Sequence, residues 1–190
     1  MTRVLHATTE LFPWVKTGGL ADVTAALPEA LAQIGVDART VVPGFPAIMA
    51  ALESATPVYE ATGLFGTATM RVLYGFLPGR KTAVYVIDAP ALFQRPGSPY
   101  SHPHGGDWND NLLRFAMLGW VAAKLAAGEL DQQWRPDVLH VHDWHPALAH
   151  AYLTETWPPV KTVFTIHNID YPGRFPPHDY GRLGLAHWLA

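Results

Sequence analysis

The sequence predicts an α/β fold built on a mostly parallel, doubly wound sheet, and three observations lead to that prediction. Short apolar segments alternate with segments of helical periodicity along most of the chain. The 17 prolines and 16 glycines stand largely between these segments, where they mark loops. Residues 57–87 differ, because β-branched and aromatic residues alternate there with small or polar ones between glycine turns. This pattern predicts a β-hairpin insertion of one or two hairpins.

The first half of the chain predicts a strand, a helix and a second strand. The strands cover residues 3–8 and 36–42, and a loop containing glycine and proline follows the first of them. The helix covers about residues 20–34, and Gly35 ends it. Its expected buried stripe consists of apolar residues at helical spacing: Leu20, Val23, Leu27, Ala30, Leu31 and Ile34.

The second half predicts a strand, a long helix and a closing β-α-β unit. In order, these are a strand over 82–87, a helix over 108–127, a strand over 137–142, a helix over 146–154 and a strand over 161–167. The long helix has an apolar stripe that includes Leu112, Phe115 and Gly119. Residues 182–190 have the apolar pattern of a further helix without a glycine cap, so the chain is expected to be a piece of a longer protein.

The composition excludes several classes of function. No cysteine is present, which excludes disulfides, thiolate zinc sites and thiol nucleophiles. The net charge is −3 without a run of like charges, so neither a nucleic-acid partner nor binding to a membrane surface is expected. The longest apolar stretch, residues 115–123, is far shorter than the roughly 20 residues that span a bilayer, and no signal peptide is evident. A cytoplasmic protein is therefore expected.

The loop before the first helix has the chemistry of an anion site. Gly18 and Gly19 stand just before the helix, where backbone N–H groups can approach a phosphate and the helix dipole favours negative charge. Lys16 adds a positive charge. The spacing matches neither the dinucleotide fingerprint nor the P-loop, so a dinucleotide-dependent oxidoreductase is the least favoured alternative. A plain helix start with an exposed lysine remains open.

A group of histidines suggests a metal site. His140 and His142 alternate along one strand and therefore share a face, and His145 follows three residues later. A metal-dependent hydrolase built on these three histidines is one alternative. The spacing misses the H-x-H-x-D-H pattern, however, because Trp144 stands where the aspartate is expected. We therefore expect no bound metal, with His140 packed in the sheet.

Polar residues end the last two predicted strands. His142 and Asp143 close one strand, and His167 and Asn168 close the next. In open α/β sheets, ligands bind outside the carboxyl ends of the strands. The loop with Lys16 and the two strand ends are therefore expected to meet in one crevice.

Five segments together resemble the bacterial glycogen synthase (starch synthase) family. Residues 16–23 read KTGGLADV, 95–100 read RPGSPY, 110–115 read DNLLRF, 135–145 read RPDVLHVHDWH and 165–168 read TIHN. These segments occur in the order of that family and extend over nearly the whole chain. The first of them is the most specific.

The resemblance implies a fold and an activity. The family has the GT-B fold, in which two Rossmann-like domains face each other across a cleft. Residues 1–190 would be the N-terminal, acceptor-side domain, truncated and lacking the C-terminal nucleotide-binding domain. The full-length enzyme would transfer glucose from ADP-glucose to the non-reducing end of an α-1,4-glucan such as glycogen, with retention and without a metal or cofactor. The fragment alone is expected to be inactive, and a non-catalytic glucan-binding module is the main alternative.

The resemblance also implies roles for individual residues. His167 would be the catalytic residue that meets the transferring glucose, with Asn168 beside it. The other substrate-binding residues would line an exposed cleft face: Lys16, Gly18 and Gly19 at the donor diphosphate and glucosyl group, Asp22, Tyr100 and Asp110 at sugar, and His142. This face would be open in the fragment, as would the apolar Leu185, Trp188 and Leu189, so self-association is expected. Residues 169–173 are more acidic than is usual in the family, so local acceptor contacts would differ.

Overall fold

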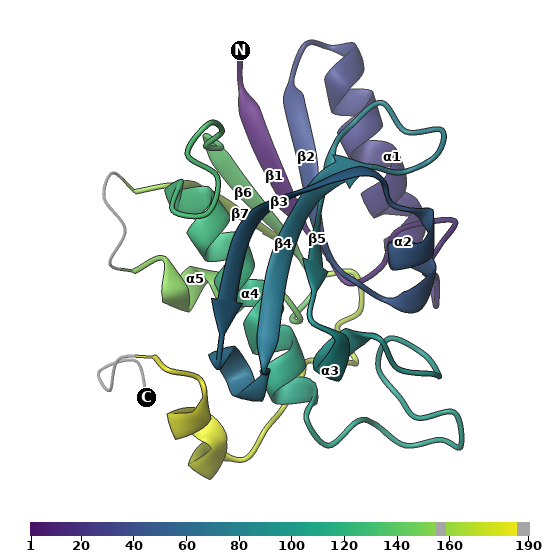
Figure 1. The fold of residues 1–190 in the computed structure, drawn as a ribbon, viewed down its shortest axis with the longest axis vertical. Helices are drawn as coiled ribbons and strands as arrows, with labels where there is room; N and C mark the ends of the chain where they lie inside the picture. The colour runs from purple at the N-terminus through teal and green to yellow at the C-terminus, as the bar shows by residue number, and fades with distance from the viewer. Residues whose placement is uncertain (155–158, 186–190) are drawn as a thin grey trace.

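Seven strands join in one sheet in the computed structural model, which describes residues 1–154 and 159–185 (Figure 1). The strands are β1 (Arg3–Ala7), β2 (Asp37–Pro43), β3 (Glu53–Thr62), β4 (Thr69–Phe76), β5 (Val84–Asp88), β6 (Val138–His142) and β7 (Lys161–Thr165). The helices are α1 (Leu20–Gln33), α2 (Pro46–Ala51), α3 (Pro90–Phe93), α4 (Asn111–Ala127) and α5 (Ala149–Tyr152), and the short 3-10 helices are η1 (Leu64–Gly66) and η2 (Pro177–Arg182).

The sheet has a parallel part and an antiparallel extension. Its strands follow the order β3-β4-β5-β2-β1-β6-β7. Strands β5, β2, β1, β6 and β7 pair in parallel, whereas β4 pairs antiparallel with both β3 and β5. The predicted fold class is confirmed, and the inserted hairpin of β3 and β4 extends one edge of the sheet.

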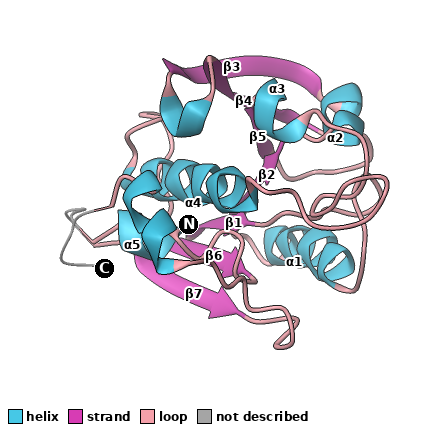
Figure 2. Ribbon diagram, turned by 90° about the horizontal axis from the view of Figure 1, so that it is seen from below, coloured by secondary structure: helices cyan, strands magenta, loops and turns pink. Residues whose placement is uncertain are grey.

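Helices cover both faces of the parallel strands (Figure 2). Helix α1 lies on one side, and α4 lies on the other side with α5 packed against it. Leu118 and Val121 of α4 are fully buried in the same core as Leu5 of β1. The apolar stripe predicted for the long helix is confirmed, because its residues are all buried.

Helix α5 approaches α4 closely at Gly119. A Cβ added to Gly119 of α4 would stand 2.9 Å from the backbone nitrogen of Ala149, so only glycine fits there without a shift of the backbone. The helix predicted over residues 146–154 was too long. Turns occupy residues 145–148, and the helix is the single turn of α5.

The buried face of α1 differs from the predicted stripe. Val23 and Ile34 are 41% and 78% exposed. The helix instead buries a set that includes small and polar residues: Leu20, Ala21, Thr24 and Pro28. The hydroxyl of Thr24 donates to the carbonyl oxygen of Glu10 at 2.7 Å, which satisfies its polar group inside the protein. A search for apolar periodicity misses such a residue.

The structure describes only the start of the C-terminal segment for which a helix is predicted. Most of the helix predicted over residues 182–190 lies outside the described residues, and η2 precedes it. Among the helices that the structure describes, none has the length and apolar character needed to cross a membrane.

Candidate active site

The carboxyl ends of β1, β6 and β7 lie at one edge of the sheet. Strand β6 pairs in parallel with both β1 and β7, so the segments that follow these three strands begin on the same side. They include Lys16 after β1, Asp143 after β6, and His167 with Asn168 after β7. The prediction that these segments start at one edge of the sheet is confirmed.

A buried carboxylate that the sequence analysis missed organises the loop after β1. Glu10 is 2% exposed, and its carboxylate accepts the backbone N–H of Thr17 at 2.7 Å and that of Gly18 at 3.4 Å. The hydroxyl of Thr17 donates to the same carboxylate, and so does the phenol of Tyr100, at 2.6 Å. Hydrogen bonds to a charged acceptor are strong, so Glu10 holds the glycine loop and Tyr100 in one arrangement. A lone acid after a strand offers no spacing pattern by which to find it.

Tyr100 joins this loop to the segment after β6. Its ring stacks on His145 at a centroid distance of 4.7 Å, and its hydroxyl also shares a hydrogen bond of 2.9 Å with Thr9. Burial and the negative charge of Glu10 raise the pKa of Tyr100 above its ordinary value. The phenol therefore stays protonated and serves as a neutral donor.

Asp143 fixes the segment after β7. Its φ of 60° lies in the left-handed region, which is unfavourable for a residue other than glycine. In this conformation its carboxylate accepts the backbone N–H of His167 at 2.6 Å and that of Asn168 at 3.2 Å. Its own N–H donates to the carbonyl oxygen of Thr165 at 2.8 Å. These three hydrogen bonds accompany the strained backbone and hold His167 beside β6.

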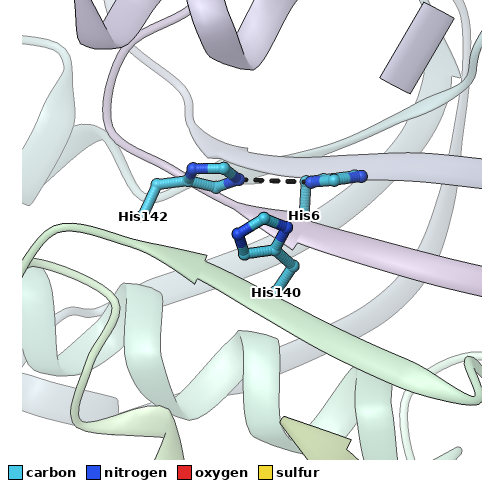
Figure 3. A group of neighbouring side chains, drawn as sticks. All are labelled: His6, His140 and His142. Atoms are coloured by element: carbon cyan, nitrogen blue, oxygen red, sulfur yellow. Dashed lines mark hydrogen bonds between the residues drawn. The ribbon is translucent and has the colours of Figure 1, made fainter. Parts of the chain in front are cut away.

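Three histidine rings form a hydrogen-bonded row from the sheet interior to His167. Nδ1 of His6 lies 3.2 Å from Nε2 of His142 (Figure 3), and Nδ1 of His142 lies 3.0 Å from Nε2 of His167. His142 is fully buried, so the expectation that its side chain lies on the exposed cleft face is wrong. His167 is partly exposed and is the ring of this row that reaches the surface. Any influence of His142 on a ligand would therefore pass through His167.

The same region shows whether the histidines suit a metal ion. His6, His140 and His142 each place one ring nitrogen within 4.8 Å of the others (Figure 3). His6 and His142 already hydrogen-bond to each other, and Nε2 of His140 hydrogen-bonds to the Thr165 hydroxyl at 2.8 Å. A metal would have to displace these bonds, so the donor set does not fit an ion as it stands.

The three-histidine site of the hydrolase alternative does not form among the described residues. His145 is buried away from the His6 group, between the rings of Tyr100 and Phe115. Neither of its ring nitrogens has a hydrogen-bond partner in the described part of the chain. Burial, with a contribution from the Arg114 charge, lowers the pKa of His145 to about 3. This residue acts as a neutral aromatic packing group.

Two predicted binding residues are paired with cations. Nζ of Lys16 lies 2.8 Å from both carboxylate oxygens of Asp22, and Arg95 donates to both oxygens of Asp110 at 2.8 and 2.6 Å. Burial alone would raise the pKa of Asp110, but the hydrogen bonds and charge of Arg95, with the charge of Arg114, lower it below its ordinary value. In this structure the two carboxylates orient Lys16 and Arg95, and a sugar would compete with these ion pairs.

Gly18 and Gly19 have open space beside them. A Cβ added at either position would meet no atom within 4 Å, and neither residue has a positive φ. The fold of this chain therefore does not require glycine at either position. The open space lies on exposed residues of the loop that also carries Lys16.

A pocket of about 420 Å³ adjoins this edge of the sheet. Its lining includes the aromatic Trp108, Trp144 and Tyr171 together with the acidic Asp170. The rings of Tyr171 and Tyr100 are 6.1 Å apart, so the pocket borders the group organised by Glu10. Flat aromatic faces beside carboxylates suit a sugar, which presents both apolar faces and hydroxyls.

Comparisons with known proteins agree with the motifs. Residues 3–190 match the family model described as the starch synthase catalytic domain. The glycogen synthase of Francisella philomiragia is 49% identical over an alignment of 188 positions, and the match covers 96% of this chain and 39% of that protein. The glycogen synthase of Francisella tularensis subsp. novicida is 48% identical over 96% of this chain and 38% of its own length. The chain therefore spans about two fifths of the length of these curated relatives.

The comparison with solved structures gives the same result. The catalytic domain of starch synthase IV from Arabidopsis thaliana, bound to ADP and acarbose, matches with a TM-score of 0.69 and 25% sequence identity. The match covers 88% of this chain and 34% of that one. It assigns the described sheet and helices to part of a GT-B glycosyltransferase.

Proposed function

Because the chain belongs to the starch synthase catalytic-domain family, we propose that it is the N-terminal, acceptor-side domain of a bacterial glycogen synthase. The complete enzyme transfers glucose from ADP-glucose to the non-reducing end of an α-1,4-glucan, with retention and without a metal or other cofactor. The Arabidopsis relative, whose structure holds ADP and acarbose, supports both the nucleotide and the glucan in this proposal. The proposed location is the bacterial cytoplasm.

The observation that carries this proposal is the meeting of the Lys16 loop and His167 at one edge of the sheet. The loop follows β1, and His167 follows β7, two strands away in the parallel part of the sheet. Tyr100 donates to Glu10 and stacks on His145, two residues after Asp143, whose carboxylate accepts the backbone N–H of His167. Such an arrangement can hold two reacting groups in a fixed orientation, which supplies much of the rate of a transfer reaction.

The loop after β1 is suited to the donor diphosphate. Gly18 and Gly19 precede α1, and the N-terminal N–H groups of a helix favour an anion. Lys16 contributes a charge from the same loop, and Glu10 fixes the loop from beneath. Pre-positioned groups of this kind stabilise the negative charge that develops on the departing ADP. His167 meets the transferring glucose in this proposal.

The positive charge available to the diphosphate from this chain is limited. Lys16 is paired with Asp22, and Arg95 is paired with Asp110. Arg114 is buried and donates to backbone carbonyl oxygens. A departing diphosphate therefore needs further cations, which we assign to the part of the enzyme outside these 190 residues. On this basis the chain alone performs no transfer.

The aromatic pocket is the proposed place for acceptor sugar. Trp108, Trp144 and Tyr171 offer ring faces, and Asp170 offers a carboxylate within the acidic segment 169–173. The same pocket favours a second candidate, a glucan-binding module without catalysis. That candidate predicts binding of maltoheptaose by the full-length protein with no glucosyl transfer from ADP-glucose, which isothermal titration and a transfer assay on one preparation would distinguish.

The test of the proposed function uses a full-length enzyme that contains this chain and measures glucosyl transfer from ADP-glucose to glycogen. His167→Ala should lower kcat at least about 100-fold, because a contact at the transferring glucose is lost. Lys16→Ala should lower kcat/KM for ADP-glucose about 10-fold to 100-fold. Lys124→Ala is the matched control, because Lys124 of α4 forms a comparable ion pair with Glu129 at 2.7 Å.

Two outcomes would overturn the proposal. Full activity of both the His167→Ala and Lys16→Ala enzymes would remove the site assignment. Robust transfer by the 190-residue chain alone would show that the cations and the catalytic groups are placed wrongly.

The self-association expected from the sequence is also part of the proposal. Strand β7 lies at the edge of the sheet, and Val163 and Phe164 on it are about half exposed. Of the apolar residues named near the chain end, Leu185 is partly buried, and Trp188 and Leu189 lie outside the described residues. Sedimentation velocity over a range of concentrations should show reversible association that weakens in Phe164→Glu.

A further inference from the structure

The row of His6, His142 and His167 constrains where the proton of His167 lies. Each contact between two imidazole nitrogens needs one nitrogen with a proton and one without. Nε2 of His142 faces Nδ1 of His6 at 3.2 Å, and Nδ1 of His142 faces Nε2 of His167 at 3.0 Å. A neutral His142 has one proton, so both hydrogen bonds must point the same way along the row.

The two inner rings are neutral near pH 7. Burial, with the nearby His140, His6 and His167, lowers the pKa of His142 to about 2. Burial, with His140 and Arg80, lowers the pKa of His6 to about 3. Two arrangements of protons remain. Either His6 donates to His142 and His142 donates to His167, or both hydrogen bonds are reversed.

The surroundings of His6 select the first arrangement. Nε2 of His6 is buried and has no hydrogen-bond partner among the described residues. This nitrogen is unpaired in either arrangement, but in the reversed one it would carry the proton of the ring, and an unpaired buried N–H group is less tolerated than an unpaired acceptor.

We propose that His6 is a positioning residue that acts through His142 to hold the proton of His167 on Nδ1. His167 then accepts a hydrogen bond at Nε2 and presents an N–H at Nδ1. No hydrogen bond joins this Nδ1 to another described residue, so it is available to donate to an oxygen of a ligand. The identity of that oxygen, a hydroxyl of the transferring glucose, rests on the proposed function, whereas the position of the proton does not.

The direct test is long-range proton–nitrogen correlation NMR of the 15N-labelled chain near pH 7.5. Nitrogens with and without a proton have distinct shifts, and the His167 signals are assigned by their loss in His167→Gln. The expected result is a protonated Nδ1 and a bare Nε2 on His167. A proton on Nε2 of His167 would overturn the proposal without any variant of His6.

Variants of His6 and His140 test whether the hydrogen bond from His6, rather than its packing, sets the tautomer of His167. His6→Phe removes the donor and should convert His167 to a mixture of both tautomers. His6→Asn places an amide nitrogen near the position of Nδ1 and should keep the Nδ1 proton of His167. His140→Phe is the matched control, because His140 packs against His6 and His142 but lies outside the row, and it should leave the tautomer unchanged. An unchanged His167 tautomer in folded His6→Phe would overturn the role of His6.

Kinetics of the full-length enzyme add a readout that a structural role would not give. His6→Phe should lower kcat about 10-fold with little change in KM for glycogen, and His6→Asn should restore most of it. A Nδ1 proton on His167 combined with full activity of His167→Ala would leave the positioning role intact and overturn the proposed function. Equal loss of activity in His6→Phe and His6→Asn would show that His6 acts through packing alone.

Discussion

The phenol of Tyr100 donates a 2.6 Å hydrogen bond to the carboxylate of Glu10, although 90 positions separate the two residues in the sequence. The same carboxylate accepts backbone N–H groups of Thr17 and Gly18. One buried charge thus couples the glycine loop after β1 to the segment that precedes α4.

The Tyr100–Glu10 hydrogen bond should contribute more to stability than a comparable bond to a neutral acceptor. Tyr100→Phe should lower the free energy of unfolding by about 2 kcal/mol, because the buried carboxylate loses a donor. Tyr152→Phe is the matched control and should cost about 1 kcal/mol, since Tyr152 donates to the carbonyl oxygen of Leu183 at the same length of 2.6 Å. Urea denaturation measures both values. Equal losses would show that Glu10 does not depend on Tyr100.

Alanine at Gly18 or Gly19 should leave the fold intact and impair function. No atom lies within 4 Å of an added Cβ at either position, so the free energy of unfolding should change by less than about 1 kcal/mol. If the donor phosphates occupy that space, kcat/KM for ADP-glucose in the full-length enzyme should fall at least about 10-fold. Gly119→Ala should behave in the opposite way and lower stability by about 1–3 kcal/mol through the contact with Ala149. Unimpaired transfer in both loop variants would argue against a phosphate site there.

The protein should lose stability as the pH falls below about 6.5. Burial lowers the pKa values of His6, His142 and His145 to about 3, 2 and 3, whereas the unfolded rings titrate near 6.5. Between these values the unfolded state binds protons that the folded state does not, so the free energy of unfolding decreases with decreasing pH. We expect a loss of about 4 kcal/mol from pH 7 to pH 5.5, measured by urea denaturation.

A pair of variants assigns this acid sensitivity to buried rings. His145→Phe should remove about 1 kcal/mol of the loss, because its ring packs among aromatic residues and makes no hydrogen bond in the described chain. His178→Gln replaces an exposed ring and should leave the loss unchanged. An identical pH dependence in both variants would contradict the assignment.

Purified protein should contain no stoichiometric zinc or other transition metal. Both ring nitrogens of His142, Nδ1 of His6 and Nε2 of His140 already make hydrogen bonds, and the chain has no cysteine. Elemental analysis of protein purified without chelators measures the metal content. One bound metal per chain that disappears in His140→Phe would overturn this prediction.

The fold class and the meeting of strand ends could be predicted because they follow from order along the chain. Alternating apolar and helical segments place parallel strands side by side, and parallel strands end at one edge of the sheet. His167 and Lys16 could be placed at that edge because each follows such a strand. The roles proposed for these residues come from the motifs, because topology alone implies none.

The missed features depend on contacts between residues far apart in the sequence. His6 contacts His142 on β6, and Glu10 contacts the glycine loop and Tyr100 in the loop before α4. No local sequence spacing predicts these partners. The buried face of α1 was predicted wrongly because Thr24 is polar by type but satisfied by the Glu10 carbonyl. His142 is fully buried because the ring of His167 lies between it and the surface. The alternation of residues along a strand does not predict this cover.

The glycine loop and the His167 segment follow strands that differ in their number of paired neighbours. Strand β1 lies inside the sheet and is hydrogen-bonded to β2 on one side and to β6 on the other, whereas β7 is an edge strand paired with β6. The residues of β7 are also mostly exposed, so opening β7 breaks one ladder and uncovers little apolar surface. Backbone amides of β7 should therefore exchange with deuterium at a lower free-energy cost than those of β1. Under the proposed function, the glycine loop is then the more rigid side of the site, and the His167 segment is the side whose position a bound sugar can adjust.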